Sequence, residues 1–293
     1  MKGSVYLEEI RNRLILLSRL MTRRMLTKLH DDDPTYENIF RLTPPEISNF
    51  FSISSQKANF IYERLHSPSL KDLVIRDQKL MTVITRLDEE FPAQLLHIPD
   101  PPYVLYCLGN IALLHEKRII SVIGTRKPSQ EAFGKLKHFI RPLVEKDWVI
   151  VSGLAYGIDS LAHRLTLANG GKAIAVLGSG FFHFYPKENL RLFEQISKKG
   201  LVMTEYPPEQ KPRKYHFPER NRLISGISMA TLVIEATEKS GTLITVDQAL
   251  EQGKEVYAVP GSPLLQQTVG CHKLIQDGAK LVINAEDIFA DFK

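Results

Sequence analysis

Residues 118–129 read RIISVIGTRKPS, in which an apolar run ends at Gly124 and two cations, Arg126 and Lys127, follow at once. The run has the length and the β-branched content of a buried strand, and glycine permits a tight turn after it. Six further runs of this kind follow along the chain: WVIVSG, AIAVLG, LVMTEY, TLVIEA, EVYAVPG and KLVIN. Because most of them are apolar on both faces, they are typical of a parallel sheet covered by helices on each side.

Segments with helical spacing alternate with these runs. They are residues 131–146, 158–171, 188–200 and 242–254. The alternation predicts an α/β fold with a doubly wound, largely parallel sheet and helices on both faces. Pro142 lies inside the first helical segment, and we expect it to kink that helix or to end it early.

The first 72 residues differ from the rest of the chain. They contain amphipathic stretches and an acidic turn, DDDP, but no strand-like run. We therefore predict a small all-helical domain at 1–72 and an α/β domain at 73–293. Residues 80–109 are expected to add two more strands, joined by a Pro-rich turn, to the larger domain.

Composition and cysteine usage restrict the class of protein. The net charge of +5 suggests an anionic partner without identifying one. Cys107 and Cys271 lack the spacing of a zinc site or of a disulfide framework. No apolar run approaches the roughly 18 residues that span a bilayer. We expect a cytoplasmic protein that contacts no membrane and uses no metal and no cofactor.

Open α/β sheets bind ligands outside the carboxyl ends of their strands, so the residues after each run are the first candidates for a site. The candidates are small, hydroxyl-bearing, amide, aromatic or cationic residues suited to a phosphate or a base. They are Gly124, Thr125, Arg126, Lys127, Ser152, Gly153, Gly157, Phe184, Lys187, Asn189, Ser240, Gly241 and Thr242.

Structural roles compete with these functional ones. Arg126 could pair with an acidic residue in a solvated turn, and Gly153 and Gly157 could serve helix-to-strand packing. Ser240 could act as a plain helix cap. Ser129 and Asp159 are expected to cap helices.

Aromatic residues crowd positions 181–185, just before Lys187. Rings beside a cation suit the stacking of bases with a phosphate held alongside. We expect at least two of these rings to belong to the core. His163 has the helical position of an inward-facing, packed histidine rather than of a catalyst.

The strongest charge cluster is KPRKYHFPERNR, residues 211–222. Basic and aromatic residues alternate there on what we interpret as a Pro-stiffened loop. Single-stranded nucleic acid binding uses this combination, because the charges follow the backbone and the rings hold the bases. A solvated charge run is the alternative. The DNA-binding residues predicted here are Arg213, Lys214, Arg220, Asn221 and Arg222.

Eight segments, taken in order, resemble the DNA-processing protein A family, called DprA or Smf. They are SVIGTRKPS, VIVSGLAYGIDSLAH, AIAVLGSG, YPKEN, TEYPP, FPERNRLISGIS, VIEATEKSGTLITVDQALEQGKEVYAVPGSP and LIQDGAKLV. Each segment alone is a modest signal, whereas eight in order over about 165 residues are highly specific.

The resemblance implies an extended Rossmann fold and a homodimer that binds single-stranded DNA. It further implies protection of incoming DNA and assistance in loading the recombinase RecA during natural transformation and recombination. In the family, the Arg of the GTR turn and nearby basic residues hold the DNA backbone. This role carries over to Arg126 and, less directly, to Lys187, Arg220 and Arg222.

Parts of the chain depart from the family pattern. The helical N-terminal part resembles the sterile-alpha-motif-like or helix-hairpin-helix-like domain of many relatives only weakly. Phe182 stands where relatives often have Asp, and the winged-helix domain of many relatives is not in this sequence. Leu264 and Leu265, in SPLLQQTV, are candidates for the dimer surface or for an ordinary loop.

The competing class is an enzyme or a nucleotide sensor of the lysine-decarboxylase-like group. Such hydrolases resemble one another in a PGGxGTxxE loop, and here EKSGTLIT has Thr245 in place of the Glu. Glu205 or Glu235 could supply a carboxylate from another strand end. The sequence has neither GxxxxGK[ST] nor GxGxxG after a strand, and no nucleophile with a base. We predict a protein without catalytic residues.

Overall fold

The computed structural model describes residues 2–292 of the 293-residue chain, with side chains from Tyr6 onward. Contacts divide the chain into two compact units. The smaller unit comprises Met1–Phe91, Pro102–Tyr106 and Glu205–Pro207, and the larger unit comprises Pro92–Pro101, Cys107–Thr204 and Pro208–Lys293. Among residues 2–292, no helix has the length and hydropathy needed to cross a bilayer.

Helices build most of the smaller unit, and local signals mark where they begin. Thr22 caps α2 by accepting a hydrogen bond from the N–H of Met25, and Thr43 and Glu46 form a capping box at α3. The helices are α1 (Lys2–Ser18), α2 (Arg23–Asp32), η1 (Asn38–Phe40), α3 (Pro44–Phe51), α4 (Ser55–Leu65) and α5 (Pro68–Leu80).

The strands β1 (Thr82–Thr85) and β2 (Val104–Gly109) are neighbours, and the sequence predicted both. A short helix, α6 (Ala93–Leu96), lies between them in the chain. The predicted domain boundary at 72/73 falls within α5, and the smaller unit continues to Phe91. A division at 72/73 therefore stays a prediction.

The larger unit contains the predicted α/β sheet, with strand order β6-β5-β4-β3-β7-β8-β9. From β6 to β9 every neighbouring pair is parallel. All seven runs noted in the sequence form strands. Their bounds are β3 (Ile119–Gly124), β4 (Val149–Ser152), β5 (Ala173–Val176), β6 (Leu201–Thr204), β7 (Ala230–Glu235), β8 (Glu255–Ala258) and β9 (Lys280–Leu281).

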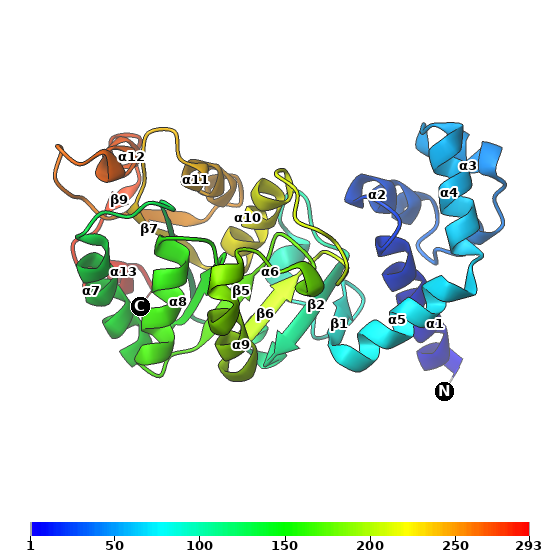
Figure 1. Cartoon of the computed structure of the whole chain (residues 1–293), viewed down its shortest axis with the longest axis horizontal. Coiled ribbons are helices and arrows are strands. Elements are labelled where there is room, and N and C mark those ends of the chain that lie inside the picture. The colour runs from blue at the N-terminus through cyan, green and yellow to red at the C-terminus, as the bar shows by residue number, and fades with distance from the viewer. Residues whose placement is uncertain (1, 293) are drawn as a thin grey trace. The chain divides into compact units, whose positions relative to one another are not determined.

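Helices cover both faces of this sheet (Figure 1). On one face α7, α8 and α9 follow one another, and on the other α10 and α11 pack together. The bounds are α7 (Ala132–Glu145), α8 (Ile158–Ala168), η3 (Phe181–His183), η4 (Lys187–Asn189), α9 (Leu190–Lys199), α10 (His216–Ile227), α11 (Gly241–Glu251), α12 (Gln266–Gln276), α13 (Glu286–Phe289), η5 (Ala290–Phe292) and, after β2, η2 (Ile111–His115).

The order in which strands are added to the sheet reverses between β3 and β7. Strands β4, β5 and β6 lie on one side of β3, whereas β7, β8 and β9 lie on the other. The helices that leave β3 and β7 therefore diverge, which leaves a crevice at the carboxyl ends of these two strands. This crevice positions the site.

Two features of the helices differ from the sequence-based expectation. Residues 216–222, interpreted as part of a loop, form the first turns of α10. Pro218 is tolerated there because the first N–H groups of a helix have no partner within the helix. Pro142 does not end α7 early, since the helix continues to Glu145.

Candidate nucleic-acid interface

An open pocket of about 860 Å³ lies at the carboxyl ends of β3 and β7. Its walls come from residues 123–127 at the end of β3, residues 155 and 159 after β4, Tyr185 after β5, residues 212–224 around the start of α10, and residues 237–245 after β7. Arg126 and the basic segment 211–222 thus meet at one cavity. The predicted DNA-binding residues that line it are Gly124, Thr125, Arg126, Lys127, Arg213, Lys214, Arg220, Asn221, Ser240, Gly241 and Thr242.

The turn that carries Arg126 is fixed by Glu235, the last residue of β7. The backbone O of Glu235 accepts a hydrogen bond from the N–H of Thr125 at 2.8 Å. Its buried carboxylate accepts hydrogen bonds from the N–H and the hydroxyl of Ser129, at 2.8 and 2.6 Å, and from Lys135 at 3.0 Å. Ser129 was expected to cap α7; the cap position belongs to Glu131, and the Ser129 hydroxyl accepts a hydrogen bond from the N–H of Glu131 at 3.1 Å while it donates to Glu235.

Glycines bring α8 against this turn. Gly157 has a φ of +76°, and a β carbon there would lie 2.8 Å from the Cα of Arg126. A β carbon on Gly124 would lie 2.6 Å from the side chain of Ile158. The packing role considered for Gly157 is therefore present, and Gly124 shares it. Asp159 does not cap α8: Gly157 holds the cap position, and the Asp159 carboxylate accepts a hydrogen bond from the N–H of Gly153.

Arg220 lies beneath the pocket rather than in solvent. Its side chain is buried, and its guanidinium donates hydrogen bonds to the backbone O of Gly153 at 2.6 Å and to that of Val176. A β carbon on Gly153 would lie 2.5 Å from the Arg220 Cζ, so glycine makes room for the guanidinium. Burial raises the pKa of Asp159, and the positive charge of Arg220 acts in the opposite direction. Arg220 therefore joins α10 to the ends of β4 and β5.

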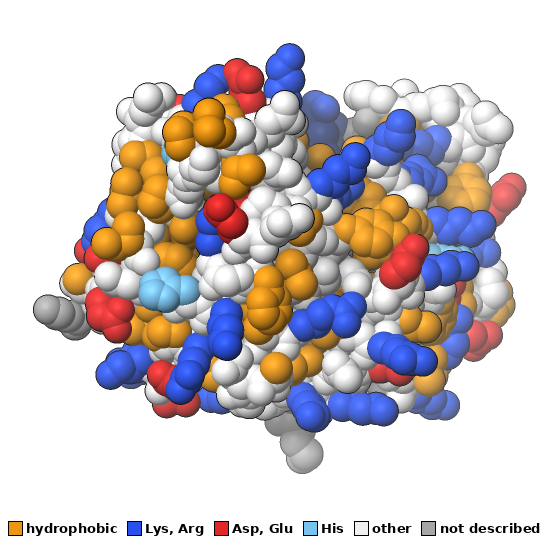
Figure 2. Space-filling view, turned by 60° about the vertical axis from the view of Figure 1, so that its left-hand side comes forward, with side chains coloured by type: hydrophobic (Ala, Val, Ile, Leu, Met, Phe, Trp, Pro, Cys, Tyr) orange, Lys and Arg blue, Asp and Glu red, His pale blue; other side chains and the backbone are white. Residues whose placement is uncertain are grey.

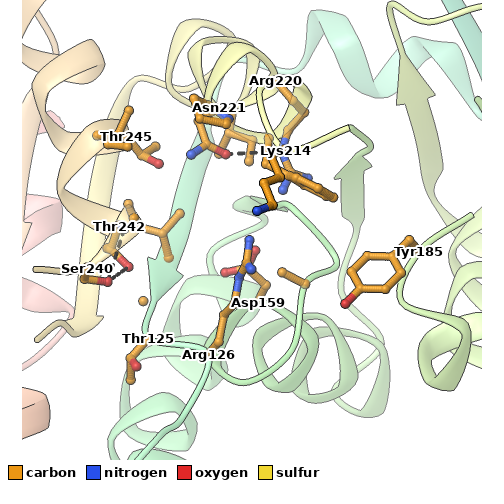
Figure 3. A pocket seen from close by; sticks show the side chains of 18 of the residues that line it. Thr125, Arg126, Asp159, Tyr185, Lys214, Arg220, Asn221, Ser240, Thr242 and Thr245 are labelled. Carbon is orange, nitrogen blue, oxygen red and sulfur yellow. Dashed lines mark hydrogen bonds between the residues drawn. The ribbon is translucent and has the colours of Figure 1, made fainter. Parts of the chain in front are cut away.

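The accessible cations of the pocket are Arg126, Lys127, Arg213 and Lys214, all of which are exposed. Arg126 and Lys214 extend into the pocket from the β3 turn and from the segment before α10 (Figure 3). The Arg126 guanidinium lies 5.6 Å from the ring centroid of Phe217, within cation–π range. Positive charge and an aromatic face are thus available side by side.

The first turn of α11 forms the opposite wall of the pocket. Ser240 caps α11, since its hydroxyl oxygen accepts a hydrogen bond from the N–H of Thr242 at 3.2 Å. The Ser240 hydroxyl also donates to the Thr242 hydroxyl at 2.9 Å (Figure 3). The capping role considered for Ser240 is therefore present. Gly241 is exposed, and a β carbon there would meet open space.

The structure places the remaining candidates outside the pocket lining. They are Ser152, Gly153, Gly157, Phe184, Lys187, Asn189 and Arg222. Ser152 is buried and donates to the backbone O of Val122 at 2.7 Å, while Arg222 is buried with its Nε 3.5 Å from a carboxylate oxygen of Asp100. Asn189 is also buried, and its side-chain N–H donates to a backbone O at 3.1 Å. Lys187 is exposed.

Several lining residues were not among the predicted ones. Tyr185, Phe217 and Thr245 line the pocket, whereas the predicted Phe184 is buried with its ring centroid 5.0 Å from that of Phe193. The phenolic hydroxyl could have favoured Tyr185 over Phe184 as a lining residue, because the Tyr hydroxyl can hydrogen-bond to water at a pocket surface and Phe has no such group.

Two expectations about packing are confirmed. Phe181 and Phe184 are buried, while Phe182 and Tyr185 are about half exposed. His163 is fully buried in α8, and burial lowers its pKa to about 3, so it is neutral at physiological pH.

Lys and Arg side chains are numerous on the face shown in Figure 2, where exposed hydrophobic side chains lie among them. In the larger unit as a whole, the exposed hydrophobic residues include Tyr185, Tyr215 and Phe182. A surface of this mixed kind offers both charge and rings to a ligand.

A parallel α/β sheet with a cationic, ring-bearing pocket at its switch point defines a Rossmann-like protein whose pocket has the chemistry to hold phosphate-containing ligands. The family model described as DNA recombination-mediator protein A matches residues 82–293. The chain belongs to this family, which confirms the resemblance noted in the sequence.

Curated relatives support the assignment. The chain is 46% identical over 218 residues to DNA processing protein DprA of Bacillus subtilis (strain 168), covering 74% of this chain and 72% of the relative. It is 46% identical over 207 residues to DNA processing protein DprA of Streptococcus pneumoniae (strain ATCC BAA-255 / R6), covering 71% and 73% respectively.

Two solved structures share the fold. The X-ray structure of DprA from Streptococcus pneumoniae matches with a TM-score of 0.83 and 36% identity, over 96% of this chain and 98% of that one. A structure of DNA processing protein A from Helicobacter pylori, described for its single-stranded DNA binding mode, matches with a TM-score of 0.65 and 28% identity, over 72% and 96%. The predicted fold class is confirmed.

We predict that Gly157→Ala lowers the free energy of unfolding by about 2 kcal/mol, because it combines a positive φ with a clash against the Arg126 turn. Urea denaturation followed by circular dichroism measures the change. Gly134→Ala is the matched control: Gly134 lies inside α7 with open space at its β position, so alanine should stabilise by about 0.5–1 kcal/mol. Equal effects of the two substitutions would contradict the packing role of Gly157.

Proposed function

We propose that this protein binds single-stranded DNA in the pocket at the ends of β3 and β7. In this role it protects incoming DNA and assists the loading of RecA during natural transformation and recombination. The observation that carries the proposal is the convergence of Arg126 with Arg213 and Lys214 on one cavity. The described binding mode of the Helicobacter pylori relative supports the same ligand.

The composition of the pocket favours an unpaired strand over a duplex. Exposed guanidinium and ammonium groups neutralise phosphates whatever the base sequence. Phe217 and Tyr185 present ring faces, and only unpaired bases can leave their own stack to use them. Backbone and base contacts are thus available within the same cavity.

We infer that the protein acts without catalysing a reaction. The Glu235 carboxylate is buried and accepts hydrogen bonds from Ser129 and Lys135, so it is committed to the β3 turn. Glu205 is paired with Arg23 at 3.0 Å in the smaller unit. Thr245 lines the pocket at the position where a hydrolase would need Glu.

The non-catalytic role predicts that the purified protein leaves AMP intact. The pocket offers no available carboxylate except Asp159, which Arg220 and the N–H of Gly153 already engage. Chromatography of AMP after prolonged incubation with the protein measures the release of free adenine. Release that scales with protein concentration and is lost in Asp159→Asn would favour the hydrolase alternative.

The proposal includes a homodimer in the cytoplasm. Leu264 is 92% exposed at the end of the segment that precedes α12, so it is available to a second copy of the chain. Cys107 and Cys271 are both free and buried, which suits a reducing compartment. Binding of RecA is inferred from the family alone.

We predict that Leu264→Asp shifts the protein from dimer to monomer, because a charge at a buried apolar contact is costly to desolvate. Light scattering across a concentration series measures the mass. A monomeric wild type would contradict the dimer, and a dimer that resists the substitution would exclude Leu264 from its interface.

The test of DNA binding is Arg126→Ala. We predict weaker binding of single-stranded DNA and a log–log salt dependence that is shallower by about 0.7, the share of one phosphate contact on a single strand. Stability should change by less than about 0.5 kcal/mol, since Arg126 is exposed. Titrations of labelled oligonucleotides over a salt series, with single and double strands, measure both quantities.

Lys137→Ala provides the control for Arg126→Ala. Lys137 is an exposed lysine of α7 that does not line the pocket, so its loss removes one charge without touching the site. An Arg126→Ala protein that binds like Lys137→Ala would remove Arg126 from the interface. Equal affinity of the wild type for single and double strands would contradict the preference for unpaired DNA.

A further inference from the structure

Three aromatic rings form a series that begins in the pocket and ends outside it. Phe217 and Tyr185 line the pocket, and their ring centroids are 6.1 Å apart. Tyr156 follows, with its centroid 6.2 Å from that of Tyr185. The three rings come from α10, from the loop after β5 and from the loop after β4, so distant parts of the chain build the series.

These rings do not belong to the core beneath them. The aromatic core of this region is separate, since Phe181 and Phe184 pack against Phe193 at 6.2 and 5.0 Å. Tyr185 is 46% exposed, and Tyr156 and Phe217 are partly exposed. Ring area left in contact with water is available to a ligand.

Two rings of the series, Phe217 and Tyr156, are held in place by contacts of their own. Phe217 lies against Gly178, where a β carbon would come within 3.0 Å of the ring. The Tyr156 hydroxyl donates a hydrogen bond to a carboxylate oxygen of Glu188 at 2.5 Å. This bond lowers the pKa of Glu188 and raises that of Tyr156 to about 12, so donor and acceptor keep their roles at neutral pH. Tyr156 is therefore anchored by its polar end while its ring stays open to solvent.

We propose that Tyr185 and Tyr156 form a stacking track for the bases of a single strand that leaves the pocket, with Phe217 at the inner end. The inference rests on the proposed function and extends it to specific bases outside the cavity. Its ligand is an unpaired polynucleotide longer than the portion that the pocket holds. A mononucleotide would occupy the pocket without reaching Tyr156.

The geometry of the track requires an extended strand. Its rings are spaced by about 6 Å and lie at 61° and 89° to each other, whereas stacked bases in B-DNA rise by about 3.4 Å. Each base would then stack on its own ring rather than on the next base. The carboxylate of Glu188 lies beside Tyr156 at the outer end, where its negative charge would repel a phosphate.

The test is the length dependence of binding. Unlabelled oligo-dT of increasing length competes with a labelled 20-mer for wild type, Tyr156→Ala and Tyr156→Phe. In wild type, the nucleotide that reaches Tyr156 should increase affinity by about 5-fold or more, the effect of one stacked base. Tyr156→Ala should lose this increment and keep those of shorter oligonucleotides, while Tyr156→Phe, which retains the ring, should keep it.

An abasic nucleotide locates the base in contact with Tyr156. In the shortest oligonucleotide with full affinity, one abasic position should weaken binding to wild type and have no effect on binding to Tyr156→Ala. This lack of additivity is the signature of a direct contact. Phe133→Ala removes a similarly exposed ring from α7. It should leave the gain in affinity per added nucleotide unchanged at every length.

The outcomes separate the track from the proposed function. If wild type binds no single-stranded oligonucleotide, the proposed function fails and the track with it. If wild type binds but Tyr156→Ala and Tyr185→Ala show its full length profile, the track is overturned and the pocket stands. If Phe133→Ala also lost the gain in affinity from the nucleotide that reaches Tyr156, the track would be overturned, because the effect would not be specific to its rings.

Discussion

The carboxylate of Glu235 is the interaction on which the arrangement of the site depends. It is buried at the end of the interior strand β7, where it is satisfied by Ser129 and Lys135, and the backbone O of the same residue holds Thr125. A buried carboxylate is tolerated only when its oxygens are paired in this way. The same contacts that satisfy Glu235 fix the turn of the adjacent strand, and with it the position of Arg126.

A second constraint is that some cationic side chains of the site have a structural role, whereas others remain accessible to a ligand. The Arg220 guanidinium donates hydrogen bonds to two backbone oxygens, and its positive charge favours the ionised form of Asp159. Arg126 and Lys214 instead extend into the open cavity. An arginine can take the structural role because its fork of donors serves several acceptors at once. In the proposed function, phosphate binding is then left to side chains that are accessible.

The strands and their order of appearance could be predicted from the sequence, because runs that are apolar on both faces have few alternatives in a protein of this size. The role of individual arginines could not. Arg220 and Arg222 lie in a basic segment that is typical of a solvated surface, yet both are buried. Gly153 makes room for Arg220, and Asp100 lies beside Arg222; both of these partners are far away in the sequence. The start of α10 was missed because Pro218 and the dense charges resemble a loop, although the first turn of a helix accepts both.

The walls of the pocket come from the ends of four strands and from α10, so no single segment of the chain contains the site. A ligand that touches all of these walls adds to contacts that already join them, such as those of α10 with α11 and of Gly157 with the Arg126 turn. A ligand that binds this pocket only in the folded protein would therefore oppose thermal unfolding of the whole sheet, and the gain in stability would grow with the logarithm of the ligand concentration.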